Sequence, residues 1–268
     1  MTSNEERGKE QRLQGNVYYE QGNYDRAMEA YIEAIKLNPN DAKAYFNCGN
    51  VCNAKGKYDN AIAGYTQAIK LDPKYANAYW GRSNVYASKG DLDRAIADLT
   101  EAIRLNPNLA MAYYNRSNAY ASKGDLDRAI ADLTEAIRFK PDYMDAYYNR
   151  GCSYEEKGDY DSAIADYTDA IRLDSHNAAV YCNRGNAYAC KGDYDMAIAD
   201  HTEAIRLEPN HVAAYFNRGL AYTKRSGDFD LAIADFETAL RIDPNNDQAK
   251  RSIELVRSLR DKTTGITA

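Results

Sequence analysis

Asparagine recurs in this chain at a fixed spacing of thirty-four residues, in two separate registers. One register holds Asn47, Asn115, Asn149, Asn183 and Asn217, and the other holds Asn16, Asn50, Asn84, Asn118 and Asn186. A side-chain amide carries an acceptor and two donors, so a row of amides can pair with the main chain of an extended peptide. The aromatic residues Trp80, Tyr114 and Tyr148 recur beside the first register and would add apolar contacts.

No group of residues in the sequence has the types and spacing that catalysis requires. We find no nucleophile paired with a base, no glycine loop able to cradle a phosphate, and no metal-binding motif. The prediction is a protein without catalytic residues, metal or cofactor. Cys152, Cys182 and Cys190 leave a redox or metal role open, although the three histidines are not placed to complete a metal site.

Arginine and aspartate recur together with the same period. The arginines are Arg82, Arg116, Arg150, Arg184 and Arg218, and the aspartates are Asp98, Asp132, Asp166, Asp200 and Asp235. Gln14 with Ala30, and Cys48 with Gly64, replace both members at once earlier in the chain. Because the two residues are lost together, we predict five ion pairs, each joining two helices of one repeat. Exposed pairs of this kind contribute only about 0 to 1 kcal/mol.

The period itself identifies the chain as an array. The stretch from Tyr86 to Arg104 recurs without change from Tyr120 to Arg138. Prolines follow the same period at Pro39, Pro73, Pro107, Pro141 and Pro209. Self-similarity of this length is typical of repeat proteins, in which single repeats are too small to fold alone and must stack.

Each repeat is predicted to form two helices, the first ending at a glycine and the second at the proline. Gly124 would close a first helix in the left-handed conformation, and Asp127 would accept hydrogen bonds from the amides that open the second. Apolar residues then follow at three- and four-residue spacing, which predicts an amphipathic helix. His201 takes the place of a large apolar residue in this pattern and is expected to pack between helices.

The most regular residues form a pattern that belongs to a known family. In the first repeat they are Gly15, Tyr18, Ala27, Tyr31, Ala34 and Pro39, and in the fifth they are Tyr147, Gly151, Tyr154, Ala163, Tyr167 and Ala170. This pattern resembles the tetratricopeptide repeat. The resemblance implies an all-α fold, an α-solenoid in which antiparallel helix pairs build a right-handed superhelix. The seven repeats span residues 8–41, 42–75, 76–109, 110–143, 144–177, 178–211 and 212–246.

The two ends of the array are expected to differ from the repeats. Residues 1–7 are predicted to be a flexible lead-in, and residues 261–268 a tail. Between them, residues 247–260 carry Ala249, Ile253, Val256 and Leu259 at helical spacing. We predict a helix there that caps the last repeat.

The resemblance also implies that first helices line a concave groove. The predicted peptide-binding residues are Arg12, Asn16, Asn47, Asn50, Trp80, Asn84, Tyr114, Asn115, Asn118, Tyr148, Asn149, Asn183, Asn186 and Asn217. The expected partner is therefore a protein or peptide. In some members of the family a groove grips the terminal carboxylate of a chaperone, and Arg12, Asn16 and Asn47 match three places of that clamp. Asn77 and Gly81 occupy the other two places, so the clamp lacks its remaining positive charge.

Composition limits the other partners. A net charge of -6 and a pI near 5.2 argue against nucleic acid, and no apolar run is long enough for membrane insertion. Five cysteines, an odd number, suit a reducing compartment, so we expect a cytoplasmic protein. Two other functions stay open: a structural or self-associating scaffold, and a regulatory module that recruits substrates to a larger enzyme. The oligomeric state, monomer or weak self-association, also stays open.

Overall fold

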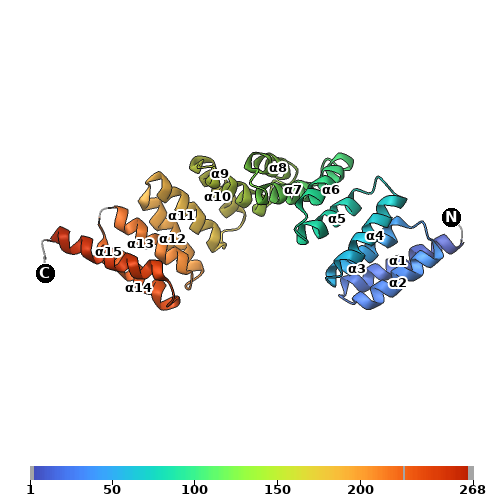
Figure 1. Cartoon of the computed structure of the whole chain (residues 1–268), viewed down its shortest axis with the longest axis horizontal. Coiled ribbons are helices and arrows are strands. Elements are labelled where there is room, and N and C mark those ends of the chain that lie inside the picture. The colour runs from blue at the N-terminus through green and yellow to red at the C-terminus, as the bar shows by residue number, and fades with distance from the viewer. Residues whose placement is uncertain (1–2, 226, 265–268) are drawn as a thin grey trace. The chain divides into compact units, whose positions relative to one another are not determined.

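The computed structural model describes residues 3–225 and 227–264, and over these residues it contains 15 α-helices and no β-strand (Figure 1). The helices follow one another as antiparallel pairs, which confirms the predicted all-α repeat fold. The chain divides into two compact parts, Met1–Lys140 and Pro141–Ala268. We call these the N-terminal and C-terminal parts.

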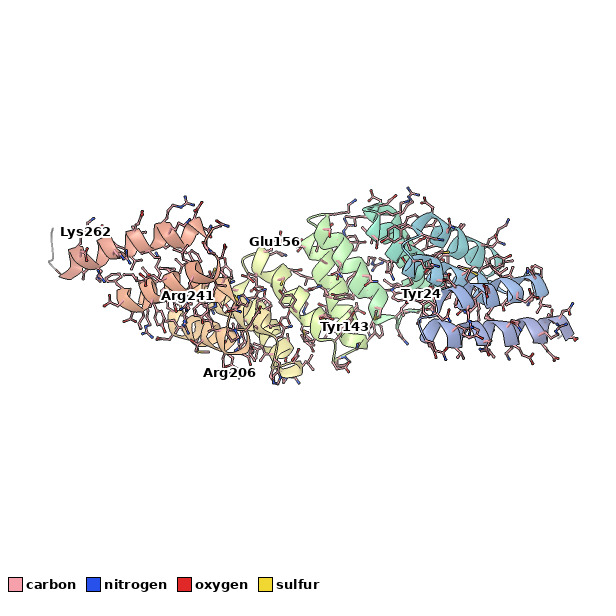
Figure 2. The ribbon with its side chains drawn as sticks, turned by 90° about the horizontal axis from the view of Figure 1, so that it is seen from below. Tyr24, Tyr143, Glu156, Arg206, Arg241 and Lys262 are labelled. Atoms are coloured by element: carbon pink, nitrogen blue, oxygen red, sulfur yellow. The ribbon has the colours of Figure 1, made fainter. Side chains whose placement is uncertain are left out.

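Each part is a run of helical hairpins. The N-terminal part contains α1 (Ser3–Glu20), α2 (Tyr24–Leu37), α3 (Ala42–Ala54), α4 (Tyr58–Leu71), α5 (Ala76–Ser88), α6 (Leu92–Leu105), α7 (Ala110–Ser122) and α8 (Leu126–Phe139). The C-terminal part contains α9 (Met144–Glu156), α10 (Tyr160–Leu173), α11 (Ala178–Lys191), α12 (Tyr194–Leu207), α13 (Val212–Arg225), α14 (Phe229–Ile242) and α15 (Asp247–Thr264). Figure 2 shows their side chains, with Tyr24 at the start of α2 and Lys262 near the end of α15.

The turn inside each hairpin depends on its glycine. Gly124 has a φ of 77°, the left-handed conformation predicted from the sequence. The predicted cap at Asp127 is wrong, because α8 is capped by Asp125, which accepts from the amide of Arg128 at 3.2 Å. The residue equivalent to Asp127 in the preceding repeat, Asp93, instead forms an ion pair with Lys123 of the next repeat. The residue directly after the glycine therefore caps the helix, two positions earlier than the sequence pattern indicated.

Close packing within a hairpin depends on one residue of the second helix, which we call the core position. Its residues are Tyr31, Tyr65, Leu99, Leu133, Tyr167, His201 and Phe236, and all are buried. A small residue of the first helix faces each of them. A Cβ added at Gly15 would lie 2.5 Å from Tyr31, so only glycine fits beside an aromatic ring there. Where the core position is leucine, serine takes the place of the glycine, at Ser83 and Ser117.

The two ends of the array are more helical than predicted. Helix α1 already begins at Ser3, so residues 3–7, expected as a flexible lead-in, belong to the first helix. Helix α15 runs to Thr264, so residues 261–264 are helical as well, while residues 1–2 and 265–268 lie outside the described residues. Within α15, Ile253 and Val256 are buried against Phe236 of α14. Arg260 also pairs with Asp230 of α14, the contact that a next first helix would make, so α15 covers the apolar side of the last hairpin.

Candidate functional site

The two asparagine registers face each other across consecutive first helices. Asn47 Nδ2 donates to Asn16 Oδ1 at 2.8 Å, which joins α3 to α1. The same bond joins α7 to α5, where Asn115 Nδ2 lies 2.7 Å from Asn84 Oδ1. The asparagines of the two registers are therefore hydrogen-bonded to each other, and they do not form a row of unpaired amides. Sequence spacing alone could not reveal this, because the bond depends on how neighbouring helices are juxtaposed.

The C-terminal part repeats the arrangement. Asn217 Nδ2 of α13 donates to Asn186 Oδ1 of α11 at 2.8 Å. Asn183 Nδ2 instead donates to the hydroxyl of Tyr148 at 3.0 Å, which joins α11 to α9. All of the predicted groove residues are half-buried, so each keeps part of its surface open. An amide that makes one such bond still has a further donor or lone pair available for another molecule. We call the surface of the first helices that carries these asparagines the groove face.

Two predicted groove residues have structural roles instead. Trp80 packs in the cluster that contains Leu99, Ala102 and Ala112, and its Nε1 atom is buried with no hydrogen-bond partner among the described residues. Arg12 binds Asp41, the cap of α3, at 2.9 Å, and both side chains are largely buried. Trp80 is therefore mainly a core residue, and the Arg12 guanidinium is already occupied by a carboxylate. Both side chains are long enough to contact neighbouring helices, and these contacts cover most of their surface.

The arginine–aspartate pairs join the two helices of single repeats. Arg116 Nε lies 2.7 Å from Asp132 Oδ2 and Arg116 Nη2 lies 2.8 Å from Asp132 Oδ1, a bidentate contact. The other four pairs, Arg82–Asp98, Arg150–Asp166, Arg184–Asp200 and Arg218–Asp235, have the same geometry. The expected exposure is wrong: only 16% of the Arg116 side chain and 9% of the Asp132 side chain are accessible. These hydrogen bonds raise the pKa of the Arg116 guanidinium above its ordinary value.

Further contacts of these arginines were not predicted from the sequence. Arg116 Nη1 donates to Thr100 Oγ1 of the preceding repeat at 3.0 Å, so the ion pair also links repeats. Its guanidinium lies over the rings of Tyr113 and Tyr120, 5.8 and 5.9 Å from their centroids. The recurring tyrosines are thus cation–π partners of the recurring arginine. Their shared period was visible in the sequence, but the contact was not.

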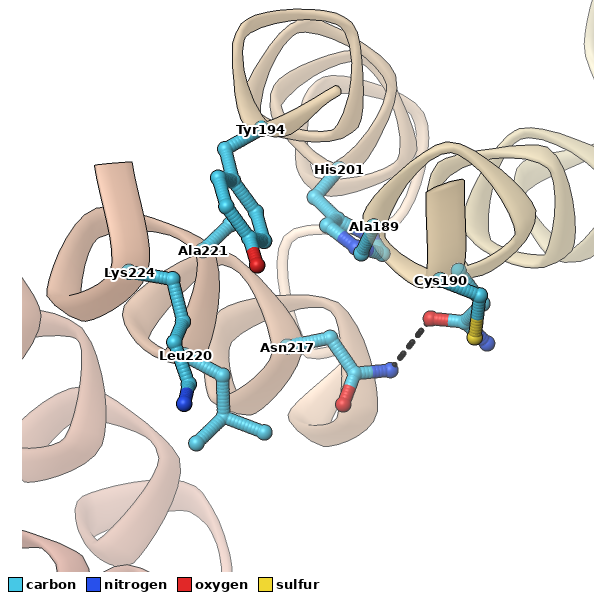
Figure 3. Close-up of a pocket in the computed structure, with 9 residues that line it drawn as sticks. Ala189, Cys190, Tyr194, His201, Asn217, Leu220, Ala221 and Lys224 are labelled. Atoms are coloured by element: carbon cyan, nitrogen blue, oxygen red, sulfur yellow. Dashed lines mark hydrogen bonds between the residues drawn. The ribbon is translucent and has the colours of Figure 1, made fainter. Parts of the chain in front are cut away.

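Two pockets open on the groove face at equivalent places, each with a volume of about 370 Å³. The α5–α7 pocket is lined by Ser83, Asn84, Ala87, Ser88, Leu92, Leu99, Asn115, Asn118, Ala119 and Ser122. The α11–α13 pocket is lined by Asn186, Ala189, Cys190, Tyr194, His201, Asn217, Leu220, Ala221 and Lys224 (Figure 3). Each lies between consecutive first helices and ends at the core position. These pockets could not be predicted from the sequence, because they depend on how far individual side chains extend.

The ionisable residues near these pockets do not form a metal site. Among the described residues, no group of three or more histidines, cysteines and acidic residues is arranged to hold a metal ion. Cys182 is buried in a cluster with Ala204 and Ala214, whereas Cys190 is exposed at the rim of the α11–α13 pocket. His201 is fully buried, as predicted, and its burial lowers the pKa of its imidazole to about 4. No helix among the described residues is long and apolar enough to cross a membrane.

Several proteins of known structure are similar to this chain in fold. The chain is 26% identical to YrrB, described as a TPR protein with an unusual peptide-binding site; the match covers 70% of this chain and 96% of YrrB, with a TM-score of 0.63. It is 30% identical to MamA over 63% of this chain and 92% of MamA, with a TM-score of 0.60. The C-terminal part of a TPR repeat-containing protein from Cytophaga hutchinsonii aligns with a TM-score of 0.75 at 18% identity, over 90% of this chain and 98% of that one, a likeness of fold.

Sequence relatives match over a shorter stretch. The Hsp70-Hsp90 organising protein of Plasmodium falciparum is 45% identical over 40 residues, and Hsp70-Hsp90 organizing protein 1 of Arabidopsis thaliana is 50% identical over 40 residues. Each match spans 15% of this chain and 7% of the relative. The TPR repeat model matches residues 15–52, 49–90, 83–124, 117–158 and 153–192, and the tetratricopeptide repeat model matches residues 178–211 and 212–246. Together with the hairpins and their cores, these matches place the chain in the tetratricopeptide repeat family.

Proposed function

We propose that the groove face binds an extended segment of a partner protein. The observation that carries the proposal is the pair of equivalent pockets between consecutive first helices, beside asparagines that keep hydrogen-bonding capacity. An extended peptide needs both features, since its main chain requires donors and acceptors while its side chains require recesses. YrrB, which is similar to this chain, is described as having a peptide-binding site, which supports the same class of function.

The amides would act as pairs. In each pair one asparagine orients the other, so the remaining donor and lone pair are held in place before the peptide arrives. Preorganisation of this kind reduces the entropy lost on binding. Truncation of Asn115 to alanine removes its hydrogen bonds to the peptide and to Asn84, which is then no longer held in orientation. We therefore expect the binding free energy of the peptide to weaken by about 1 kcal/mol, or about fivefold in Kd.

The test uses the full chain and a displayed library of random dodecapeptides. Selected peptides are synthesised, and their Kd values are measured by isothermal titration calorimetry. Asn115→Ala and Asn217→Ala should weaken binding about fivefold or more. Arg104→Ala, at an exposed pair on the second helix α6, is the matched control and should leave Kd unchanged. A library that yields no binder, or binders that lose affinity only with the α6 control, would contradict the proposal.

Other functions predict different results. A self-associating scaffold would show a mass in solution above that of one chain, in the absence of any peptide. The carboxylate clamp is less favoured, since Arg12 is already paired with Asp41. A module that recruits substrates to a larger enzyme would also bind peptides, so identifying the partner would distinguish it. The odd number of cysteines supports a cytoplasmic location for this activity.

A further inference from the structure

The pockets occur where the core position does not reach the groove face. In the first and second repeats the core position is tyrosine, and its hydroxyl donates to an asparagine of the first helix. Tyr31 lies 3.0 Å from Asn16 Oδ1, and Tyr65 lies 2.8 Å from Asn50 Oδ1. Burial raises the pKa of Tyr31 to about 12, so its hydroxyl stays protonated and acts as the donor. Leucine and histidine are shorter than tyrosine, and the two pockets described above end at Leu99 and His201.

The shorter residue leaves one hydrogen bond unmade. Asn16 Oδ1 accepts two bonds, one from Tyr31 and one from Asn47. Asn186 Oδ1 is the equivalent atom in the α11–α13 pocket, and among the described residues it accepts only from Asn217. A carbonyl oxygen has two lone pairs, so one acceptor site on Asn186 is open at the place where the first repeat holds a phenol hydroxyl.

The floor of the α11–α13 pocket also contains polar atoms without hydrogen-bond partners. His201 is fully buried, and neither of its ring nitrogens has a hydrogen-bond partner among the described residues. A buried polar atom without a partner is destabilising relative to one that is paired. Figure 3 shows His201, Tyr194, Asn217 and Leu220 arranged around this pocket. A guest that carries a hydroxyl group would donate to the open acceptor of Asn186.

The walls of this pocket are suited to an aromatic ring. Leu220, 41% exposed, stands where the α5–α7 pocket has Asn118. Ala189, Ala221 and the ring of Tyr194 complete an apolar wall. The α5–α7 pocket instead carries three serines in its lining, which makes it the polar counterpart within the same chain. The two pockets therefore differ in chemistry while sharing one geometry.

We propose that the α11–α13 pocket binds the side chain of a tyrosine from the partner, with the ring against Leu220 and Tyr194 and the hydroxyl donating to Asn186 Oδ1. The inference rests on the proposed function, because it assigns one side chain of the bound segment to one recess of the groove face. In the first and second repeats the hydroxyl of the core tyrosine occupies the asparagine oxygen, whereas in the sixth repeat the shorter His201 leaves the Asn186 oxygen open.

One substitution can close the pocket without disturbing the helices. Gly185 already faces His201, as Gly15 faces Tyr31, so the first helix leaves room for a larger ring. His201→Tyr should therefore fold, place its own hydroxyl beside Asn186, and fill the recess. Leu99→Ile, at the floor of the α5–α7 pocket, conserves volume and serves as the control for a change at the core position elsewhere in the chain.

The experiment titrates N-acetyltyrosinamide into the ¹⁵N-labelled full chain and follows backbone amide resonances. We expect saturable shifts at Ala189, Leu220 and Ala221 with a Kd of about 1 mM, typical of a ligand of this size. N-acetylphenylalaninamide should bind about fivefold more weakly, because it lacks the hydroxyl. His201→Tyr should weaken tyrosinamide binding at least about tenfold, because its own ring fills the recess and its hydroxyl satisfies Asn186.

Three results would overturn the inference. These are the absence of shifts at the pocket residues, equal binding of the two amides, and unchanged binding in His201→Tyr. A failure here is distinguishable from a failure of the proposed function. If library peptides bind the groove face but tyrosinamide does not enter the pocket, only the tyrosine site is lost. If tyrosinamide binds but the library yields no peptide, the tyrosine site stands as a small-molecule site and peptide binding is refuted.

Discussion

Breaking one buried ion pair should destabilise its hairpin far more than an exposed pair would allow. In Arg116→Gln, the Asp132 carboxylate, which is 9% exposed, loses both bonds from the guanidinium. Leaving a buried carboxylate without its partner is destabilising by about 3 kcal/mol. The double variant Arg116→Gln/Asp132→Ala copies the residues that the first repeat has at these places, Gln14 and Ala30. Because no unpaired charge remains, we expect its stability to lie within about 1 kcal/mol of wild type.

Native-state hydrogen exchange measures this effect where it occurs. The quantity is the opening free energy of the amides of α7 and α8, which avoids assuming that the whole array unfolds in one step. Arg128→Gln is the matched control, since it breaks an exposed pair with Asp125 and should change the opening free energy by no more than about 0.5 kcal/mol. The reasoning would be refuted if Arg116→Gln behaved like this control, or if the double variant were as unstable as the sum of its two single variants.

Three other predictions concern the packing of the array. Burial lowers the His201 pKa from 6.5 to about 4, so between these pH values the unfolded chain binds the proton more readily than the folded chain. Lowering the pH from 6.5 to 4 should therefore reduce the free energy of unfolding of wild type by about 3 kcal/mol more than that of His201→Tyr, as measured by urea titration. Gly151→Ala places a Cβ 2.7 Å from Tyr167 and should lower the melting temperature. The double variant Gly151→Ala/Tyr167→Leu should recover most of that decrease, and equal melting temperatures for the two variants would contradict the packing described. Ile253→Asp should reduce the opening free energy of α14 and α15 by about 2 to 5 kcal/mol, and unchanged hydrogen exchange there would show that α15 is not a cap.

The helices and turns could be predicted because they depend on local chemistry. Glycine at the end of a first helix is required for a left-handed turn, and Gly124 has that conformation. The spacing of Ala129, Leu133 and Ala136 indicated the buried face of α8, and all three residues are buried. The cap was misplaced by two residues because Asp125 and Asp127 are both suited to a helix start, and sequence alone does not distinguish them.

Contacts between helices could be predicted only where residues change together. Arginine and aspartate are absent from the same repeats, and this joint loss indicated that they touch. The asparagine registers carry no such signal, so their mutual hydrogen bonds, such as Asn115 to Asn84, required the structure. Burial of the ion pairs was also missed, since it results from the tyrosines and the neighbouring repeat that cover each arginine.

The pockets were beyond sequence reasoning for a different reason. A recess at the groove face depends on the difference in length between residues such as Tyr31 and His201 at the same position in two repeats. In the sequence His201 is only a departure from a pattern. Its significance is that its side chain does not hydrogen-bond to Asn186 Oδ1, and this can be seen only in the folded hairpin.

Mapping a library-selected peptide onto the full chain by amide chemical shifts tests the central claim most directly. We expect the largest shifts in the first helices, at Asn84, Asn115 and Asn118 in the N-terminal part or at Asn186 and Asn217 in the C-terminal part. Shifts confined to second helices such as α6 or α12, with the asparagines unaffected, would contradict peptide binding at the groove face.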